Sequence, residues 1–282
     1  MKSIAVIGAG AMGSQIAFVT ALAGYETKLI DISEDALTLA KTNITTYTNK
    51  LVEKGHFTPD QVASAFDSLT FMHEIAVGVS DADLVIEAIV EKLEVKQQLF
   101  QQLSEITRQD TILASNSSTI VSSKLIDGVQ NPERVCNLHF FNPAIKMNLV
   151  EIVKGEHTSE ETIAKAKAYV QSIDKKAVVL EKEIYGFIVN RLLNVFFDEA
   201  IYLYENGYAS FEEIDIAIKN GLNHPMGPFE LLDYTGIDVN YFVRQVEYEE
   251  TKDEGKKPQK ILTELYERGD LGRKTKKGFY QY

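Results

Sequence analysis

Short apolar runs rich in β-branched residues alternate with longer amphipathic segments through the first two thirds of the chain. Strands are predicted over residues 4–7, 27–30, 84–86, 112–114, 135–140, 149–153 and 177–180. Helices are predicted over residues 12–23, 34–54, 92–107 and 159–172, with Ser33 and Ser159 as N-caps and with Gly24 and Gly55 as stop signals. Because strands that alternate with helices form parallel sheets covered on both faces, we expect a largely parallel α/β fold.

The strand pattern ends near residue 183, and the remaining sequence reads as helix and turn. We therefore expect an α/β domain over residues 1–183 and an all-helical domain over residues 184–282. A helix predicted over residues 186–206 carries apolar side chains around most of its circumference and so needs burial on most sides. We predict that part of this surface packs against a second copy, giving a homodimer through the helical domain. Burial between the two domains of one chain is the alternative.

The composition narrows the possible partners. Hydrophobic residues make up 45% of the chain, as in ordinary globular proteins, and the net charge of −12 disfavours binding to nucleic acid or to an anionic membrane surface. A single cysteine, Cys136, and five scattered histidines point neither to a disulfide scaffold nor to a metal site. No apolar run approaches the ~20 residues of a membrane span, and no signal-peptide core follows Met1, so we expect a cytoplasmic protein.

A glycine-rich loop directly follows the first predicted strand and opens a helix. The segment Gly8-Ala9-Gly10-Ala11-Met12-Gly13 fits the G-x-G-x-x-G pattern. In that setting Gly8 makes the tight turn, Gly10 lets a pyrophosphate approach the backbone, and Gly13 permits close helix packing. Asp31 ends the second strand about 20 residues on, where a carboxylate can accept hydrogen bonds from a ribose diol. No arginine follows Asp31, which favours NAD over NADP; the alternative is a glycine-rich turn beside a surface aspartate.

Polar residues cluster where several other strands end. They lie in the segments Ala114-Ser115-Asn116-Ser117-Ser118, His139-Phe140-Phe141-Asn142-Pro143 and Leu149-Val150-Glu151-Ile152-Val153. Ligands of open parallel sheets bind beyond the carboxyl ends of the strands, so the residues just past Ala114 and Leu138 should meet the cofactor.

His139 is the candidate acid/base. Oxidation of a secondary alcohol by NAD requires a base for the hydroxyl proton, and an imidazole, which ordinarily titrates at about pH 6.5, can serve in both directions. Glu151 on the next predicted strand could orient it, as the acid of a catalytic triad does. Each candidate residue has an alternative interpretation. His139 could be a buried core histidine, Ser117 or Ser118 could cap a helix, and Asn190 could be an ordinary polar residue of a helix.

These segments, with Gly186-Phe187-Ile188-Val189-Asn190-Arg191, His224-Pro225-Met226-Gly227-Pro228-Phe229-Glu230-Leu231 and Gly278-Phe279-Tyr280-Gln281-Tyr282, resemble the short-chain L-3-hydroxyacyl-CoA dehydrogenases. The resemblance spans essentially the whole chain and is strongest to the bacterial 3-hydroxybutyryl-CoA dehydrogenases. It implies a Rossmann-like dinucleotide-binding domain followed by a helical domain, NAD as the cofactor, and interconversion of (S)-3-hydroxyacyl-CoA and 3-oxoacyl-CoA.

The resemblance also implies roles for individual residues. His139 would be the catalytic base and Glu151 its orienting carboxylate, while Ser118 and Asn190 would hydrogen-bond the substrate. The cofactor contacts would be Gly8, Gly10, Ala11, Met12, Gly13, Asp31, Glu91, Lys96 and Asn116, and lysines near the CoA moiety would be Lys50 and Lys54. A sugar-acid dehydrogenase on the same scaffold and a non-catalytic NAD-binding protein are the competing interpretations.

Overall fold

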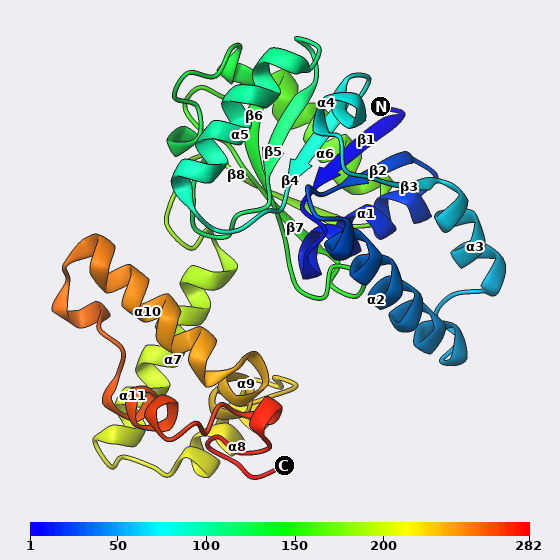
Figure 1. The fold of residues 1–282 in the computed structure, drawn as a ribbon. Helices are drawn as coiled ribbons and strands as arrows, with labels where there is room; N and C mark the ends of the chain where they lie inside the picture. The colour runs from blue at the N-terminus through cyan, green and yellow to red at the C-terminus, as the bar shows by residue number, and fades with distance from the viewer. The chain divides into compact units, whose positions relative to one another are not determined.

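The computed structural model describes residues 1–282 except for the side chains of Glu250 and Thr251. The chain divides into two compact units, Met1–Ile188 and Val189–Tyr282. Figure 1 shows a sheet with helices in the first unit and helices with connecting loops in the second. Among the described residues, no helix has both the length and the apolar character needed to cross a bilayer.

The first unit is built on an eight-stranded sheet with the strand order β3-β2-β1-β4-β5-β6-β7-β8. Its neighbouring strands pair in parallel except for β6 and β7, which are antiparallel. The first six strands have the order of a dinucleotide-binding sheet, which confirms the predicted Rossmann-like fold. The strands are β1 (Ser3–Ile7), β2 (Glu26–Ile30), β3 (Leu69–Met72), β4 (Leu84–Glu87), β5 (Ile112–Ser115), β6 (Val135–Phe140), β7 (Leu149–Val153) and β8 (Lys176–Leu180).

Helices cover both faces of this sheet (Figure 1). Alternate residues of β1 point to opposite faces: Ile4 and Val6 pack in the core with α1 and α6, whereas Ala5 and Ile7 pack in the core with α5. The near-continuous burial of the strands is what a sheet covered on both faces requires. The helices are α1 (Ala11–Leu22), α2 (Glu34–Glu53), α3 (Pro59–Asp67), α4 (Ile75–Val79), α5 (Leu93–Ile106) and α6 (Glu160–Ser172), with short 3-10 turns η1 (Ser122–Lys124) and η2 (Pro132–Arg134).

The predicted caps are confirmed, but one strand and two helices were missed. The Ser33 hydroxyl accepts a hydrogen bond from the N–H of Ala36, and Ser159 caps α6 in the same way. β3 is a strand of four residues at the edge of the sheet, and its run Leu69–Met72 is too short and only partly buried to stand out from the surrounding sequence. The capping box formed by Thr58 and Gln61 is the sequence pattern that could have predicted α3.

The second unit is helical throughout its regular structure, as the sequence indicated. Its helices are α7 (Val189–Glu205), α8 (Phe211–Gly221), α9 (Pro228–Thr235), α10 (Ile237–Thr251) and α11 (Lys260–Glu267), with 3-10 turns η3 (Glu254–Lys256) and η4 (Arg273–Thr275). The prediction that α7 begins at Gly186 is wrong. Gly186 and Phe187 have φ values of 74° and 50°, and the helix therefore starts only at Val189.

Two buried aspartates organise the second unit. Asp215 accepts the N–H groups of Phe229 and Glu230 at the start of α9, each at 2.9 Å. Asp233, at the other end of α9, accepts the N–H groups of Phe279 and Tyr280, again at 2.9 Å. Burial raises the pKa of both carboxyls against the opposing effect of these hydrogen bonds. The two side chains thus fix the chain terminus to α9.

Candidate active site

The glycine loop joins β1 to α1 with no room for side chains at two of its positions. Gly8 has a φ of 104°, and a Cβ there would lie 2.5 Å from the carbonyl oxygen of Ala88. A Cβ at Gly13 would overlap with the carbonyl oxygen of Gly8, whereas Gly10 has open space around it. The loop therefore closes tightly on the sheet and presents its exposed backbone, with Ala11 and Met12 in the first turn of α1, to a ligand.

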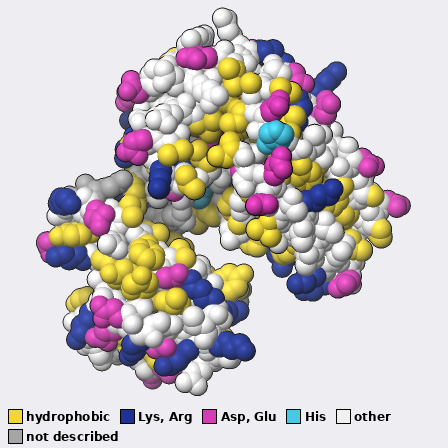
Figure 2. Space-filling view, in the orientation of Figure 1, with side chains coloured by type: hydrophobic (Ala, Val, Ile, Leu, Met, Phe, Trp, Pro, Cys, Tyr) yellow, Lys and Arg dark blue, Asp and Glu magenta, His cyan; other side chains and the backbone are white. Residues whose placement is uncertain are grey.

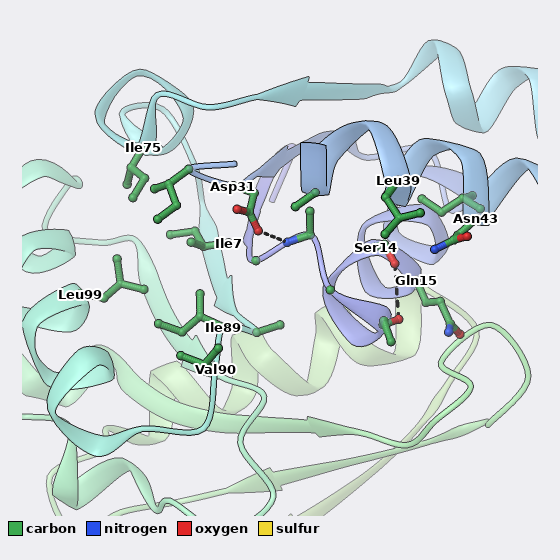
Figure 3. A pocket seen from close by; sticks show the side chains of 18 of the residues that line it. Ile7, Ser14, Gln15, Asp31, Leu39, Asn43, Ile75, Ile89, Val90 and Leu99 are labelled. Carbon is green, nitrogen blue, oxygen red and sulfur yellow. Dashed lines mark hydrogen bonds between the residues drawn. The ribbon is translucent and has the colours of Figure 1, made fainter. Parts of the chain in front are cut away.

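Asp31 lies one residue beyond β2 and holds this loop. Its Oδ2 accepts the N–H of Ala9 at 2.7 Å, and its Oδ1 accepts the N–H of Ser33 at 2.9 Å. Figure 3 shows the carboxylate directed at the loop backbone. Each carboxylate oxygen has further acceptor capacity, so this contact leaves Asp31 able to receive a ribose hydroxyl.

A cavity of about 930 Å³ lies over the loop. Apolar side chains form most of its walls, and Figure 3 shows Leu39 of α2 together with Ile89 and Val90 beyond β4 around it. Leu39 and Val90 are exposed. Such walls suit the flat face of an adenine ring, and no Lys or Arg occurs among the described residues that line the cavity. Polar lining residues that the sequence reading did not single out are Gln15, Asn43 and Tyr47.

The shape and the donors of the loop fit a dinucleotide. Gly10 leaves space where a pyrophosphate would approach, and the free N–H groups at the start of α1 supply partial positive charge there. Among the described residues, those that line the cavity include no cationic side chain, which matches a ribose without a 2′-phosphate.

His139 and Glu151 are direct partners across the antiparallel strands β6 and β7. Nδ1 of His139 lies 2.8 Å from Oε2 of Glu151, and both side chains are buried. The other carboxylate oxygen, Oε1, accepts the N–H of Ile188 at 3.0 Å. The imidazole is flanked by the rings of Phe141 and Phe187, with centroid distances of 4.5 and 5.4 Å. Glu151 thus fixes Nδ1 and leaves Nε2 as the nitrogen available for proton transfer.

The turn after β5 carries Asn116, Ser117 and Ser118. Oδ1 of Asn116 accepts the N–H of Phe140 at 2.9 Å, so its amide supports the strand end next to His139. Ser117 does not cap a helix; its hydroxyl accepts the N–H of Ile120 at 2.7 Å and closes a turn. Ser118 lies on that turn, and no regular helix follows it before η1.

Lys96 and Glu91 form part of a charge cluster that also contains Glu87, in which Glu87 and Lys96 are buried and Glu91 is partly exposed. The Lys96 ammonium, 1% exposed, lies 2.5 Å from Oε1 of Glu87 and 3.1 Å from Oε2 of Glu91. The sequence reading missed Glu87, whose only signal was a carboxylate at the end of the apolar run Leu84–Glu87. For Glu91, burial opposes ionisation, but Lys96, Ser117 and Thr119 outweigh it and lower the pKa of this carboxyl.

The remaining predicted residues lie on α2, at its C-cap and on α7. Lys50 and Lys54 are exposed and follow Asn43 and Tyr47 at three- to four-residue spacing, so they continue the face of α2 that lines the cavity. Asn190 is the second residue of α7 and belongs to the second unit.

Comparison with known proteins places these features in one family. Residues 3–184 match the NAD-binding domain of 3-hydroxyacyl-CoA dehydrogenase, and residues 186–282 match the C-terminal domain of 3-hydroxyacyl-CoA dehydrogenase. A 3-hydroxybutyryl-CoA dehydrogenase of Bradyrhizobium diazoefficiens is 38% identical over 282 residues, which cover 100% of this chain and 96% of the relative. The mitochondrial hydroxyacyl-coenzyme A dehydrogenase of Sus scrofa is 38% identical over 288 residues, covering 100% and 91%.

The solved structures agree. The crystal structure of (S)-3-hydroxybutyryl-CoA dehydrogenase from Ralstonia eutropha superposes with a TM-score of 0.91 at 34% identity, covering 100% of this chain and 99% of that one. NAD is the cofactor that the matched N-terminal domain binds. On the strength of both domain matches and of full-length relatives, the chain belongs to the family of NAD-dependent 3-hydroxyacyl-CoA dehydrogenases.

Proposed function

We propose that this protein interconverts short-chain (S)-3-hydroxyacyl-CoA, such as 3-hydroxybutyryl-CoA, and the corresponding 3-oxoacyl-CoA, such as acetoacetyl-CoA. The observation that carries the proposal is the buried His139–Glu151 pair in the unit that holds the NAD loop. The names of the relatives from Bradyrhizobium and Ralstonia support the four-carbon substrate.

His139 moves the proton in this reaction. Because its Nδ1 faces the Glu151 carboxylate, the neutral ring carries its proton on Nδ1 and offers the lone pair of Nε2 to the substrate hydroxyl. NAD held by the glycine loop and Asp31 would supply the acceptor for the hydride of the carbon that bears the hydroxyl in oxidation, and NADH would supply the hydride in reduction. Glu151 stabilises the imidazolium that forms in oxidation, and that imidazolium returns its Nε2 proton to the carbonyl oxygen in reduction.

Other side chains hold the reactants. In this proposal Ser118 and Asn190 hydrogen-bond the substrate oxygen, and Asn116, Glu91 and the glycine loop bind or shape the cofactor site. Lys50 and Lys54 attract the CoA phosphates, because both side chains are exposed at the C-terminal end of α2, beyond the cavity-lining residues Asn43 and Tyr47. The helical domain, predicted over residues 184–282, has the proposed role of completing the substrate site and forming the dimer.

Apolar side chains exposed on the second unit support the proposed homodimer. On α7 they are Leu192, Val195 and Tyr202, at spacings that place them on one helix face. Figure 2 shows hydrophobic side chains gathered on the second unit over α7 and α10, with charged side chains around them. A contiguous exposed apolar patch of this kind is typical of a surface that binds a protein partner.

A cytoplasmic location belongs to the same proposal. The only cysteine of the sequence, Cys136, is buried and unpaired, which suits a reducing compartment. Separation of soluble and membrane fractions of the native cell, followed by immunodetection, tests this location.

A substrate panel tests the proposed reaction. In one assay, the absorbance of NADH falls as acetoacetyl-CoA is reduced. In a parallel assay, the absorbance of NADH rises if NAD oxidises a sugar acid such as gulonate. Turnover with acetoacetyl-CoA alone supports the proposal, and turnover with the sugar acid alone contradicts it. NADH binding without turnover of either compound would instead identify a non-catalytic NAD-binding protein.

A further inference from the structure

We propose that Glu87 is a positioning residue of this dehydrogenase. Through Lys96 it fixes Glu91, and through Ser115 it fixes the turn over residues 115–120 that carries Asn116 and Ser118. The inference rests on the proposed function for the roles of Asn116 and Ser118, but the hydrogen bonds that carry it are independent of the substrate.

The Glu87–Lys96 pair is deeply buried. Glu87 is fully buried at the end of β4, and Lys96 reaches it from α5. Oε1 of Glu87 also accepts the N–H of Ile89 at 2.8 Å, so the carboxylate is held on two sides. Apolar residues of similar volume commonly replace a buried ion pair without loss of stability. Stability alone therefore does not call for these two charges, and the hydrogen bonds that they make at the carboxyl end of β4 indicate that they position the neighbouring segments.

Two arms lead from the pair to the same turn. In the first, the Ser115 hydroxyl donates to Oε2 of Glu87 at 2.7 Å and accepts the N–H of Ser117 at 3.1 Å. In the second, Lys96 binds Oε2 of Glu91. Oε1 of Glu91 then accepts the hydroxyls of Ser117 and Thr119, the latter at 2.9 Å.

The position of the turn is passed on to the catalytic strand. The N–H of Asn116 donates to the backbone carbonyl of Glu87 at 2.8 Å. The amide Oδ1 of Asn116 accepts the N–H of Phe140, the residue that follows His139. A displacement of Glu87 would thus reach both Ser118 and the end of β6 that carries His139. Because a misplacement of about 1 Å can cost about 10²-fold in rate, such a displacement should be visible in kinetics.

The first test uses Glu87→Gln, which keeps the size of the side chain and removes its charge. We expect about ten-fold weaker NADH binding, measured by NADH fluorescence titration, and at least ten-fold lower kcat with acetoacetyl-CoA. The matched control is Asp215→Asn, which alters a buried carboxylate with two N–H donors in the second unit. The control should lower the melting temperature and leave the NADH dissociation constant within two-fold of the parent.

Two further variants separate positioning from charge balance. Glu87→Leu combined with Lys96→Met removes both charges, so the melting temperature should return toward that of the parent. Because Lys96 is itself a predicted cofactor contact, the comparison is with Lys96→Met alone, which keeps the Glu87–Ser115 hydrogen bond, and the NADH affinity and kcat of the double variant should stay below those of Lys96→Met. Ser115→Ala keeps the ion pair and removes only the first arm, and it should fold normally with about ten-fold lower kcat. Recovery of NADH affinity and kcat together with the melting temperature in the double variant would overturn the proposal, as would parent-like values in Ser115→Ala and Glu87→Gln.

NADH titration needs no acyl-CoA, which keeps the two proposals distinguishable. If the parent protein binds NADH but fails to reduce acetoacetyl-CoA, the proposed function is wrong, and the effect of Glu87→Gln on NADH binding still decides the inference about Glu87. If the parent turns over acetoacetyl-CoA and Glu87→Gln matches it in NADH binding and kcat, only the inference about Glu87 is wrong.

Discussion

Glu151 uses its two carboxylate oxygens for two different partners, Nδ1 of His139 at 2.8 Å and the N–H of Ile188 at 3.0 Å. A carboxylate held at both oxygens cannot rotate freely, so the orientation of the imidazole is set by the backbone as well as by the strand pairing. The same contact fixes the segment that leads into α7.

Glu151→Gln should reduce kcat by about 10²- to 10⁴-fold. The amide can still accept the Ile188 N–H, but its NH₂ group can donate to Nδ1 and force the tautomer with the proton on Nε2, which cannot act as the base. Steady-state kinetics of 3-hydroxybutyryl-CoA oxidation measure the loss, with Glu161→Gln, a surface partner of Lys165, as the control. A kcat within two-fold of the parent would show that Glu151 does not orient His139.

Asp31→Asn should weaken NADH binding about ten-fold and shift the cofactor preference toward NADPH. The amide keeps one acceptor oxygen for the loop but loses the charge that strengthens hydrogen bonds to a ribose and that repels a 2′-phosphate. Parallel titrations with NADH and NADPH give the ratio of the two dissociation constants. Asp35→Asn, on the exposed first turn of α2, is the control, and an unchanged ratio in Asp31→Asn would contradict the assignment.

Removal of Lys50 and Lys54 together, both to Ala, should raise KM for acetoacetyl-CoA several-fold and flatten its dependence on salt. In a chain with a net charge of −12, the proposed role of these ammonium groups is local attraction for the CoA phosphates, and salt screens exposed charges. Lys41→Ala is the control because Lys41 lies on α2 at a second cavity, of about 560 Å³, lined also by Phe66 and Phe71. Equal salt slopes in the parent and the double variant would exclude the two lysines from CoA binding.

Glu91→Gln should destabilise the protein at neutral pH, and the difference from the parent should shrink in acid. Lys96, Ser117 and Thr119 overcome the effect of burial and lower the pKa of Glu91 below its ordinary 4.5. A depressed carboxyl pKa contributes stability above the unfolded-state value, and this contribution is lost as the pH falls through the folded-state value. Urea unfolding at a series of pH values measures the difference. Glu94→Gln, exposed in the first turn of α5, should show no such trend, and a constant difference for Glu91→Gln would refute the prediction.

Leu192→Glu should turn the proposed dimer into a monomer. The Leu192 side chain is 66% exposed in the single chain, and a carboxylate at the centre of an apolar contact would be buried without a partner. Light scattering coupled to size exclusion measures the mass. Val77→Glu adds the same charge at an exposed apolar position of α4 and should leave the mass unchanged. A monomeric parent would contradict the proposed dimer. A dimeric Leu192→Glu variant would show that the dimer contact does not include Leu192.

The features that sequence revealed are those encoded locally. The bounds of β6 and β7 agree with the prediction because each is a continuous, largely apolar run that is buried over most of its length. The pairing of His139 with Glu151 followed from their places on adjacent strands. The glycine loop was legible because a strand, a turn and a helix meet within a few residues.

The features that sequence did not reveal depend on contacts between distant segments. Lys96 can be buried because Glu87 of β4 and Glu91 of the following loop both contact its ammonium group. Nothing in the sequence around Lys96 indicates this burial. The start of α7 is set by the left-handed backbone of Phe187, whose ring packs beside His139. An apolar pattern alone cannot show where such tertiary packing interrupts a helix.

His139→Gln tests the central claim most directly, through the reduction of acetoacetyl-CoA followed by the absorbance of NADH, with NADH binding measured on the same sample. Glutamine can hydrogen-bond but cannot transfer a proton in this role, so turnover should fall by about 10²- to 10⁴-fold while the NADH dissociation constant stays within two-fold of the parent. Near-parental turnover in a folded His139→Gln protein would contradict the account, because the reaction would then proceed without the imidazole.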